Sequence, residues 1–196
     1  ARVQLRVRSL APAAAAALAR EVARDCAQAD VELLLNRDIT LAAELGVGVH
    51  LGSEQLAGLA GRPLPPGQAV GASCHDLAGL RQAVALGCDF AVLGPLQATA
   101  SHPGAATLGW DGFVALREQV ALPIYAIGGL TPADLAIARG HGAQGIAAIG
   151  GSADASPGMA VAPAGPRTRG LAATVPAVAR RRRSRCRRGG ARTGRR

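Results

Sequence analysis

Short apolar stretches alternate with longer segments of mixed polarity over the first 150 residues of the chain. Residues 3–7 alternate between apolar and polar side chains, which is typical of a strand with one face on a core. Residues 13–27 are rich in Ala, Leu and Arg and follow Pro12, which predicts a helix. Further strands are predicted at 31–36, 47–51, 69–74, 90–94, 122–127 and 146–149, and further helices at 39–45, from 53, at 76–86, at 111–120 and from 131.

The predicted strands, seven in all, alternate with helices. This order favours an α/β protein with a parallel sheet. A (β/α)8 barrel and an open doubly wound sheet are the two candidate architectures. No G-x-G-x-x-G sequence follows the first predicted strand, which weakens the dinucleotide-binding alternative.

Small or polar residues follow four of the predicted strands. The segment Ser73–His75 ends one strand, and Gly94–Pro95, Gly128–Gly129 and Gly150–Gly151 follow three others. In a barrel, the carboxyl ends of the parallel strands lie on one common face, where catalytic and phosphate-binding groups collect. We therefore expect a site at this face that combines the Ser-Cys-His segment with the glycine turns.

Composition divides the chain into two parts. Hydrophobic residues make up 49% of the 196 residues and aromatic residues only 2%, so a core must be built from Ala, Val, Leu and Ile. After residue 151, Ala, Gly, Pro, Ser and Arg dominate and no amphipathic pattern is present. We predict a barrel domain over residues 1–151 and a disordered, Arg-rich, low-complexity tail over residues 152–196.

The basic character of the chain belongs to the tail. Residues 1–150 contain 10 Arg and 12 Asp or Glu, a net charge of −2, whereas residues 151–196 contain 12 Arg and one Asp, a net charge of +11. Nucleic acid is therefore expected to bind only non-specifically, through the tail. The chain has no lysine, which excludes a Schiff-base lysine and a P-loop lysine.

The remaining composition points to a protein of the cytoplasm. Its four cysteines form no C-x-x-C pair and are expected to be reduced thiols (Cys26, Cys74, Cys88 and Cys186). No apolar run is long enough to span a bilayer, and residues 1–30 lack the pattern of a signal peptide. No membrane partner is expected.

Seven motifs, in order, resemble the thiamine phosphate synthase/TenI family of barrels over residues 3–150. They are similar above all to the form fused behind a Nudix hydrolase domain. The motifs are Val3-Gln4-Leu5-Arg6, Asn36, Val49-His50-Leu51-Gly52, Gly71-Ala72-Ser73, Asp89 to Pro95, Ala126 to Leu130, and Gly145-Ile146-Ala147. The resemblance implies a TIM (β/α)8-type barrel that lacks the family's first strand here, and a possible Nudix domain on the N-terminal side in the full-length protein.

The resemblance also implies a set of ligand-binding residues. In the synthase a pyrimidine diphosphate is joined to a thiazole phosphate, with magnesium on the diphosphate. Side chains expected near the substrates and phosphates are Gln4, Arg6, Arg8, Asn36, Ser73, Thr99 and His102. Backbone groups expected to hold the thiazole phosphate are those of Gly128, Gly129, Ala148, Ile149 and Gly150.

The two metal-binding positions depart from the synthase pattern. The family's metal-binding acidic residues correspond to Arg37 and Gln55 here, and magnesium prefers carboxylate oxygens. The TenI branch isomerises a thiazole phosphate without metal or diphosphate, using a histidine two residues after the serine, and His75 matches that position. An imidazole has a pKa suited to proton transfer near neutral pH.

Our main hypothesis is therefore a TenI-like tautomerase that binds a thiazole phosphate, with His75 as acid/base, Ser73 beside it and no cofactor. One alternative is thiamine phosphate synthase, which would need Mg²⁺ and a pyrimidine diphosphate. Another is a non-catalytic ligand-binding module of a Nudix fusion protein. His50 is expected to orient a strand end rather than to react.

Overall fold

A parallel sheet with helices on its outer side forms the core of the protein. The structure, a computed structural model, describes residues 2–7, 9–98, 104, 106–149 and 159–161. Seven parallel strands follow one another in sequence order across the sheet. They are β1 (Arg2–Leu5), β2 (Glu32–Asn36), β3 (Gly48–Leu51), β4 (Val70–Cys74), β5 (Phe90–Leu93), β6 (Ile124–Ile127) and β7 (Gly145–Ile149).

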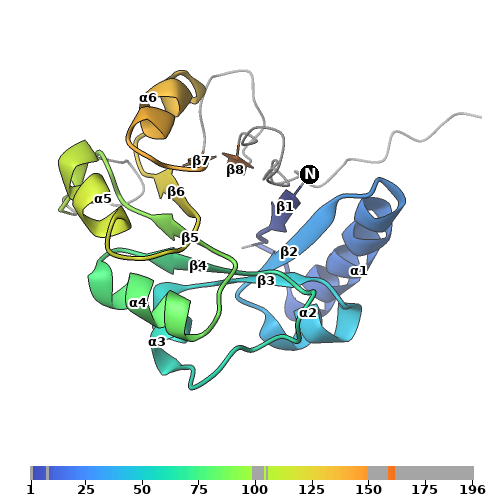
Figure 1. The fold of residues 1–196 in the computed structure, drawn as a ribbon. Helices are drawn as coiled ribbons and strands as arrows, with labels where there is room; N and C mark the ends of the chain where they lie inside the picture. Colours follow the sequence, from blue (N-terminus) through green and yellow to red (C-terminus); the bar gives the residue numbers. More distant parts are fainter. Residues whose placement is uncertain (1, 8, 99–103, 105, 150–158, 162–196) are drawn as a thin grey trace, which may run out of the picture.

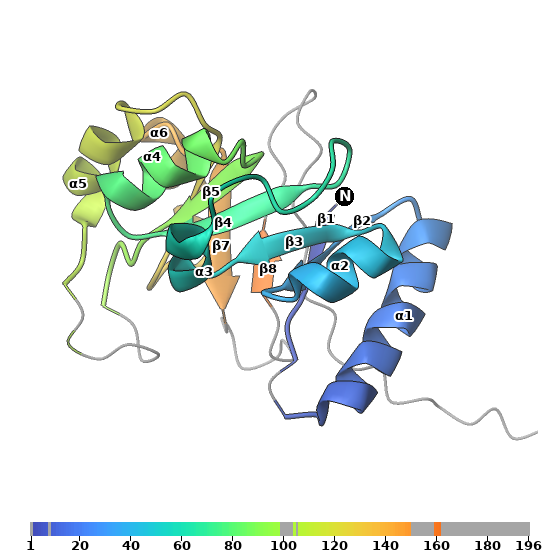
Figure 2. The ribbon, with the colours of Figure 1, turned by 90° about the horizontal axis from the view of Figure 1, so that it is seen from below.

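The sheet is curled, and the helices lie along its convex side (Figures 1 and 2). An eighth strand, β8 (Met159–Val161), pairs antiparallel with β7. The helical elements are α1 (Pro12–Gln28), α2 (Ile39–Leu45), α3 (Ser53–Gly58), α4 (Leu77–Ala85), α5 (Gly109–Arg117), the 3₁₀ turn η1 (Pro132–Asp134) and α6 (Leu135–Gly140). This is the (β/α) barrel architecture predicted from the sequence, as a partly open barrel.

The strands build two separate apolar clusters, one on each side of the sheet. The larger cluster lies between the sheet and the helices and includes Leu51, Leu93 and Phe113, which are almost fully buried. The smaller cluster is on the concave side and is centred on Phe90. The Phe90 ring occupies the space where a side chain at Gly71 would be, since a Cβ there would lie 2.2 Å from Phe90 Cζ.

The concave side is polar on β1 and β2 and apolar on β5 and β6. At the amino ends of the strands, Arg2 Nε donates to Glu32 Oε2 at 2.5 Å, and the Arg2 guanidinium lies 4.8 Å from the centroid of the Phe90 ring. Tyr125 stacks edge-on against the same ring, with 5.8 Å between centroids. These contacts fill the barrel interior near the amino ends of the strands. The interior at the carboxyl ends of the strands is left for polar groups.

Two aspartates start helices, as residue preferences predict. The Asp38 carboxylate accepts from Leu41 N at 3.0 Å at the start of α2, and Asp76 accepts from Gly79 N at 2.8 Å at the start of α4. Both caps follow directly on strand ends. They therefore fix the loops that lead from the carboxyl-terminal face into the helices.

Three residues of the tail predicted to be disordered, Met159–Val161, form β8 and pair antiparallel with the edge of β7. The disorder of the tail stays a prediction. The rest of the predicted tail lies outside the described residues. Among the described residues, the structure contains no helix with the length and hydropathy of a transmembrane span.

Candidate active site at the carboxyl ends of the strands

The first two strands meet in a hydrogen bond between two predicted ligand-binding residues. Gln4 on β1 and Asn36 at the end of β2 both point to the concave side, and Gln4 Nε2 donates to Asn36 Oδ1 at 2.9 Å. Gln4 is 8% exposed. The structure therefore brings these two predicted residues together and fixes the orientation of both amides, since an amide oxygen can only accept.

The next two strands are joined by His50 on β3 and Ser73 on β4. His50 Nε2 lies 2.9 Å from Ser73 Oγ, and Asn36 is the register partner of His50 in the β2–β3 ladder. His50 is 5% exposed. Burial, together with the positive charges of Arg6 and Arg37, lowers the pKa of His50 to about 4. The ring is therefore neutral at physiological pH.

Arg6 and Arg37 form the charged rim of this polar group. Arg6 follows β1, Arg37 follows β2, and both are exposed at the carboxyl-terminal face. Both act on the His50 imidazole through their charge. Arg6, whose role in ligand binding stays a prediction, thus lies beside Arg37, which was not predicted as a binding residue.

His75 is held by the next strand. Its Nδ1 lies 2.5 Å from the carbonyl oxygen of Gly94, just after β5. Because a carbonyl oxygen only accepts, Nδ1 donates in this hydrogen bond, and Nε2 is the ring nitrogen that remains for a ligand. The side chain is exposed at the end of β4. This is the arrangement that an acid/base histidine requires, although its role as a catalyst stays a prediction.

The Gly128–Gly129 turn after β6 lies next to the loop that follows β5. Leu96 N donates to Ile127 O at 2.9 Å, and Gln97 N donates to Gly128 O at 3.1 Å. The two glycines have φ values of +105° and +69°, and a Cβ on Gly128 would lie 2.6 Å from Pro95 Cα. Glycine is therefore required here by both conformation and close approach. That this turn holds a phosphate stays a prediction.

Thr131 is the N-cap residue of η1, the helical segment after this turn. Its backbone amide and its hydroxyl both donate to Asp134 Oδ2, at 2.7 and 2.8 Å. These two hydrogen bonds lower the pKa of Asp134. The Asp134 side chain thus reaches back to the N-cap residue, as the third helical residue does in a capping box.

The two positions that correspond to metal-binding acids in the family lie side by side. Gln55 Nε2 donates to Arg37 O at 2.8 Å, and Gln55 Oε1 accepts from Gly52 N at 3.3 Å. The Arg37 guanidinium lies against Gly52, where a Cβ would be 2.6 Å from Nε. No cluster of three or more His, Cys, Asp or Glu suited to a metal occurs in the described part of the chain. These residues do not fit Mg²⁺, which prefers carboxylate oxygens.

Several predicted site residues cannot be placed in this geometry. Arg8, Thr99, His102 and Gly150 lie outside the described residues. Ala148 and Ile149 lie on β7, and their backbone is part of the ladder with β8.

Cys74 is next to His75 but has no nucleophilic character. It is 2% exposed, and burial raises the pKa of its thiol to about 12. The thiol is therefore protonated at neutral pH and behaves as a small core residue. Cys26 and Cys88 are also free and buried.

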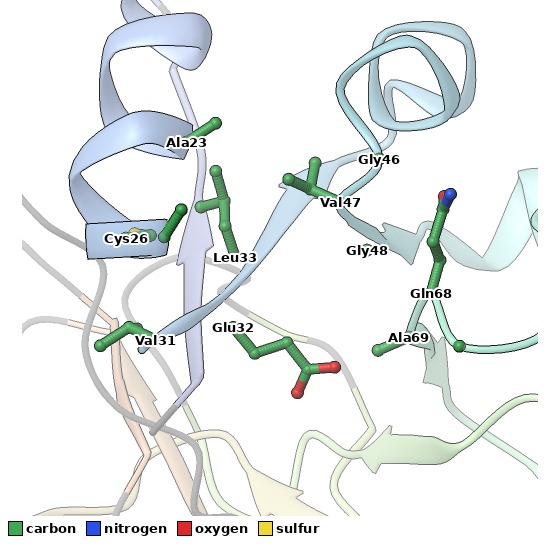
Figure 3. A pocket seen from close by; sticks show the side chains of 12 residues that line it. Ala23, Cys26, Val31, Glu32, Leu33, Gly46, Val47, Gly48, Gln68 and Ala69 are labelled. Carbon is green, nitrogen blue, oxygen red and sulfur yellow. The ribbon is translucent and has the colours of Figure 1, made fainter. Parts of the chain in front are cut away.

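A pocket of about 210 Å³ lies away from these groups, where α1 and the amino ends of β2, β3 and β4 meet (Figure 3). Its lining includes Cys26, Glu32, Gly48 and Gln68. In (β/α) barrels the amino-terminal face serves stability, whereas chemistry takes place at the carboxyl-terminal face. We therefore place the candidate site at the polar groups of the strand ends and not in this pocket.

Comparison with known proteins assigns the family of this barrel. Residues 1–151 match the family model described as thiamine monophosphate synthase, and the chain belongs to this family. It is 38% identical over 125 residues to the thiamine-phosphate synthase of Chloroflexus aurantiacus, covering 62% of this chain and 57% of that protein. It is also 38% identical over 138 residues to the thiamine-phosphate synthase of Methanoculleus marisnigri, covering 69% of this chain and 64% of that protein.

A solved structure supports the same fold. The thiamine phosphate pyrophosphorylase from Pyrococcus furiosus superposes with a TM-score of 0.60 at 21% identity, covering 76% of this chain and 71% of that one. At this identity the likeness concerns the fold alone. The chain spans less than two thirds of the length of both curated relatives named above.

Sequence reasoning missed the contribution of two residues to this site. His50 was expected only to orient a strand end, yet it joins the predicted Ser73 through a hydrogen bond inside the barrel. Arg37 was seen only as a departure from a metal-binding pattern. The signal for both is their position: each lies on the concave side or at the carboxyl end of a strand, beside a residue that was predicted.

Proposed function

We propose that this domain binds a thiazole phosphate at the carboxyl-terminal face of its barrel and joins it to a pyrimidine diphosphate, as a thiamine phosphate synthase. The support for this reaction is that the relatives carry this name while matching the chain across the strands that form the site. In the reaction the thiazole nitrogen forms a bond to the pyrimidine methylene carbon. The carbon–oxygen bond to the diphosphate breaks, and pyrophosphate leaves with the electron pair.

The side chains of the site have complementary tasks in this proposal. The polar strands contribute Gln4, Asn36, Ser73 and the cationic rim, all suited to a charged and polar pyrimidine diphosphate. The Gly128–Gly129 turn, on the apolar half of the barrel, is suited to the phosphate of the thiazole. The neutral His50 holds the Ser73 hydroxyl in place, so that Ser73 has a defined orientation toward the ligand.

The isomerisation of a thiazole phosphate, our main hypothesis from the sequence, remains a second candidate. The observation that favours it is the bond from His75 Nδ1 to Gly94 O, which leaves Nε2 as a base at the strand end. Proton removal and return on a small ring needs one such group and no metal. The two candidates share the thiazole phosphate site and differ in the second substrate.

The first experiment is a pair of assays on the full chain and on a His75→Ala variant. A synthase forms thiamine phosphate and pyrophosphate from both substrates, and His75→Ala is expected to retain this activity. A tautomerase converts the thiazole phosphate alone, and His75→Ala should reduce that rate by about a hundredfold or more. Calorimetry with the thiazole phosphate verifies that the variant still binds.

The results separate the candidates. Product formation that requires the pyrimidine diphosphate and survives His75→Ala supports the synthase. Conversion of the thiazole phosphate alone, lost in His75→Ala, supports the tautomerase instead. Binding without turnover in either assay would contradict both reactions and indicate a ligand-binding module, and absence of thiazole phosphate binding would reject the proposed site itself.

A further inference from the structure

The charged rim of the site consists of two arginines, and one of them, Arg37, stands where the family uses an acidic residue. Arg6 and Arg37 follow neighbouring strands, and both positive charges act on the His50 imidazole. Within the described residues, Arg37 forms no ion pair with a carboxylate. The nearby acids have other positions: the Asp38 carboxylate accepts from Leu41 N, and Glu54 is exposed in the first turn of α3.

The backbone of Arg37 is held from two directions. Its amide donates to His50 O at 2.9 Å, and its carbonyl accepts from Gln55 Nε2 at 2.8 Å. Its φ of 65° is in the left-handed region, which a non-glycine residue adopts only when its surroundings enforce it. The local structure thus fixes the backbone at position 37, and with it the direction in which the side chain leaves the end of β2.

The Arg37 side chain also has a place prepared for it. The guanidinium lies on Gly52, and a Cβ there would come within 2.7 Å of Cζ and Nη2. Gly52 has a φ of −74°, so its conformation does not require glycine. The missing side chain therefore leaves room for the guanidinium.

We propose that Arg37 holds the diphosphate of the second substrate in the place where the family uses magnesium, so that this chain binds diphosphate without a divalent cation. The inference rests on the proposed function. A guanidinium presents a planar fork of N–H donors that matches two phosphoryl oxygens at once. An anion between Arg6 and Arg37 also relieves the repulsion between two like charges at the rim. The same fixed positive charge stabilises the pyrophosphate that leaves.

The test uses calorimetric titration of the full chain with inorganic pyrophosphate, at about 0.15 M salt to screen non-specific attraction. One series contains EDTA and the other contains Mg²⁺. We expect binding in EDTA, with no gain in affinity from Mg²⁺. In Arg37→Asn, pyrophosphate affinity is expected to fall about tenfold or more, because a charge-assisted bidentate contact is lost. Asparagine is chosen because it tolerates positive φ.

The matched control is Arg24→Ala, which removes the same charge from an exposed position on α1. It should bind pyrophosphate like the unmodified chain. Any pyrophosphate binding by the arginines after residue 151 is the same in every variant. Gly52→Ala is the second variant: it displaces the guanidinium while leaving the charge in place, and it is expected to weaken binding several-fold with an unchanged circular dichroism spectrum.

A double variant, Arg37→Asp with Gln55→Asp, restores two carboxylates and is expected to make pyrophosphate binding depend on Mg²⁺.

The inference is overturned if the unmodified chain binds pyrophosphate only with Mg²⁺, or if Arg37→Asn binds like Arg24→Ala. A separate titration with thiazole phosphate distinguishes a failure of this inference from a failure of the proposed function. If it binds while pyrophosphate does not bind in EDTA, the inference fails and the thiazole phosphate site stands; if neither ligand binds, both fail.

Discussion

His50 is a neutral imidazole that lies inside the barrel near two guanidinium groups. Burial and the charges of Arg6 and Arg37 each oppose its protonation, while its Nε2 is bonded to Ser73 Oγ. The imidazole thus connects β3 to β4 without adding charge to a rim that is already cationic. At the scale of single residues, the electrostatics of the site and the stability of the fold depend on the same group.

The lowered pKa of His50 predicts a loss of stability in mild acid. An unfolded chain takes up the proton near the ordinary pKa of 6.5, while the folded chain resists protonation until about pH 4. The free energy of unfolding should therefore fall as the pH drops from about 6.5 to about 4, by about 3 kcal/mol from this group, and stay level below that. Urea unfolding at pH 7 and pH 5 measures the change.

His50→Gln provides the control for this prediction. Glutamine does not titrate, so the difference in stability between the unmodified chain and this variant should shrink as the pH falls from 7 to 5. A difference that is the same at both pH values would show that His50 does not carry the effect.

Gly94 is a position where even a methyl group is too large. A Cβ there would lie 2.1 Å from the carbonyl oxygen of Ile127, which is backbone and cannot move aside. That oxygen also accepts from Leu96 N. We expect Gly94→Ala to lower the free energy of unfolding by about 2–4 kcal/mol. Gly58→Ala, with no atom within 4 Å of its Cβ, should be neutral or slightly stabilising in the same urea titration.

At the scale of elements, the loops of the carboxyl-terminal face depend on the helix starts beside them. Asp76 lies next to His75 and caps α4 through Gly79 N. Asp76→Ala should lower the free energy of unfolding by about 1 kcal/mol, measured by chemical denaturation. Asp76→Asn keeps a capping oxygen and should retain most of that stability; equal losses in both variants would show that the negative charge, rather than the cap, is what matters.

The sequence predicted the elements well where periodicity and capping agree. The predicted helix 39–45 has the same bounds as α2, and the strand predicted at 90–94 differs from β5 by one residue. The helix predicted at 111–120 begins at Gly109 instead and ends at Arg117. β8 was missed because Met159–Val161 gains its structure from pairing with β7 and not from its own pattern.

The sequence predicted several residues of the site but not all of their hydrogen-bond partners. The predicted residues Gln4 and Asn36 are hydrogen-bonded, and Ser73 and His75 lie at the end of β4 as expected. The partners His50 and Gly94 could not be derived, because each depends on the register between strands that are distant in sequence. Register is set by the packing of both faces of the sheet, and a single strand's pattern carries little of that information.

At the scale of the whole molecule, charge is divided between the two parts of the chain. The net charge is −2 for residues 1–150 and +11 for residues 151–196. We expect the full chain to bind duplex DNA weakly at low salt, with an affinity that falls steeply as salt is added and does not depend on the base sequence. Fluorescence anisotropy with labelled duplexes of two different sequences measures both properties.

A chain that ends after Val161 retains β8 and removes most of the arginines. It should show little DNA binding at any salt concentration. Its circular dichroism spectrum should still show the secondary structure of the barrel. DNA binding that survives this truncation would place the contact on the barrel and contradict the prediction.

Three side-chain hydrogen bonds of the site cross from one strand to a neighbouring strand or its loop: Gln4 to Asn36, His50 to Ser73, and His75 to the carbonyl of Gly94. A slip of any strand by one residue would turn its site residue outward toward the helices. The site therefore forms only when the strands that carry these residues are paired in the correct register. Ligand binding is thus also a measure of correct strand pairing among the first five strands.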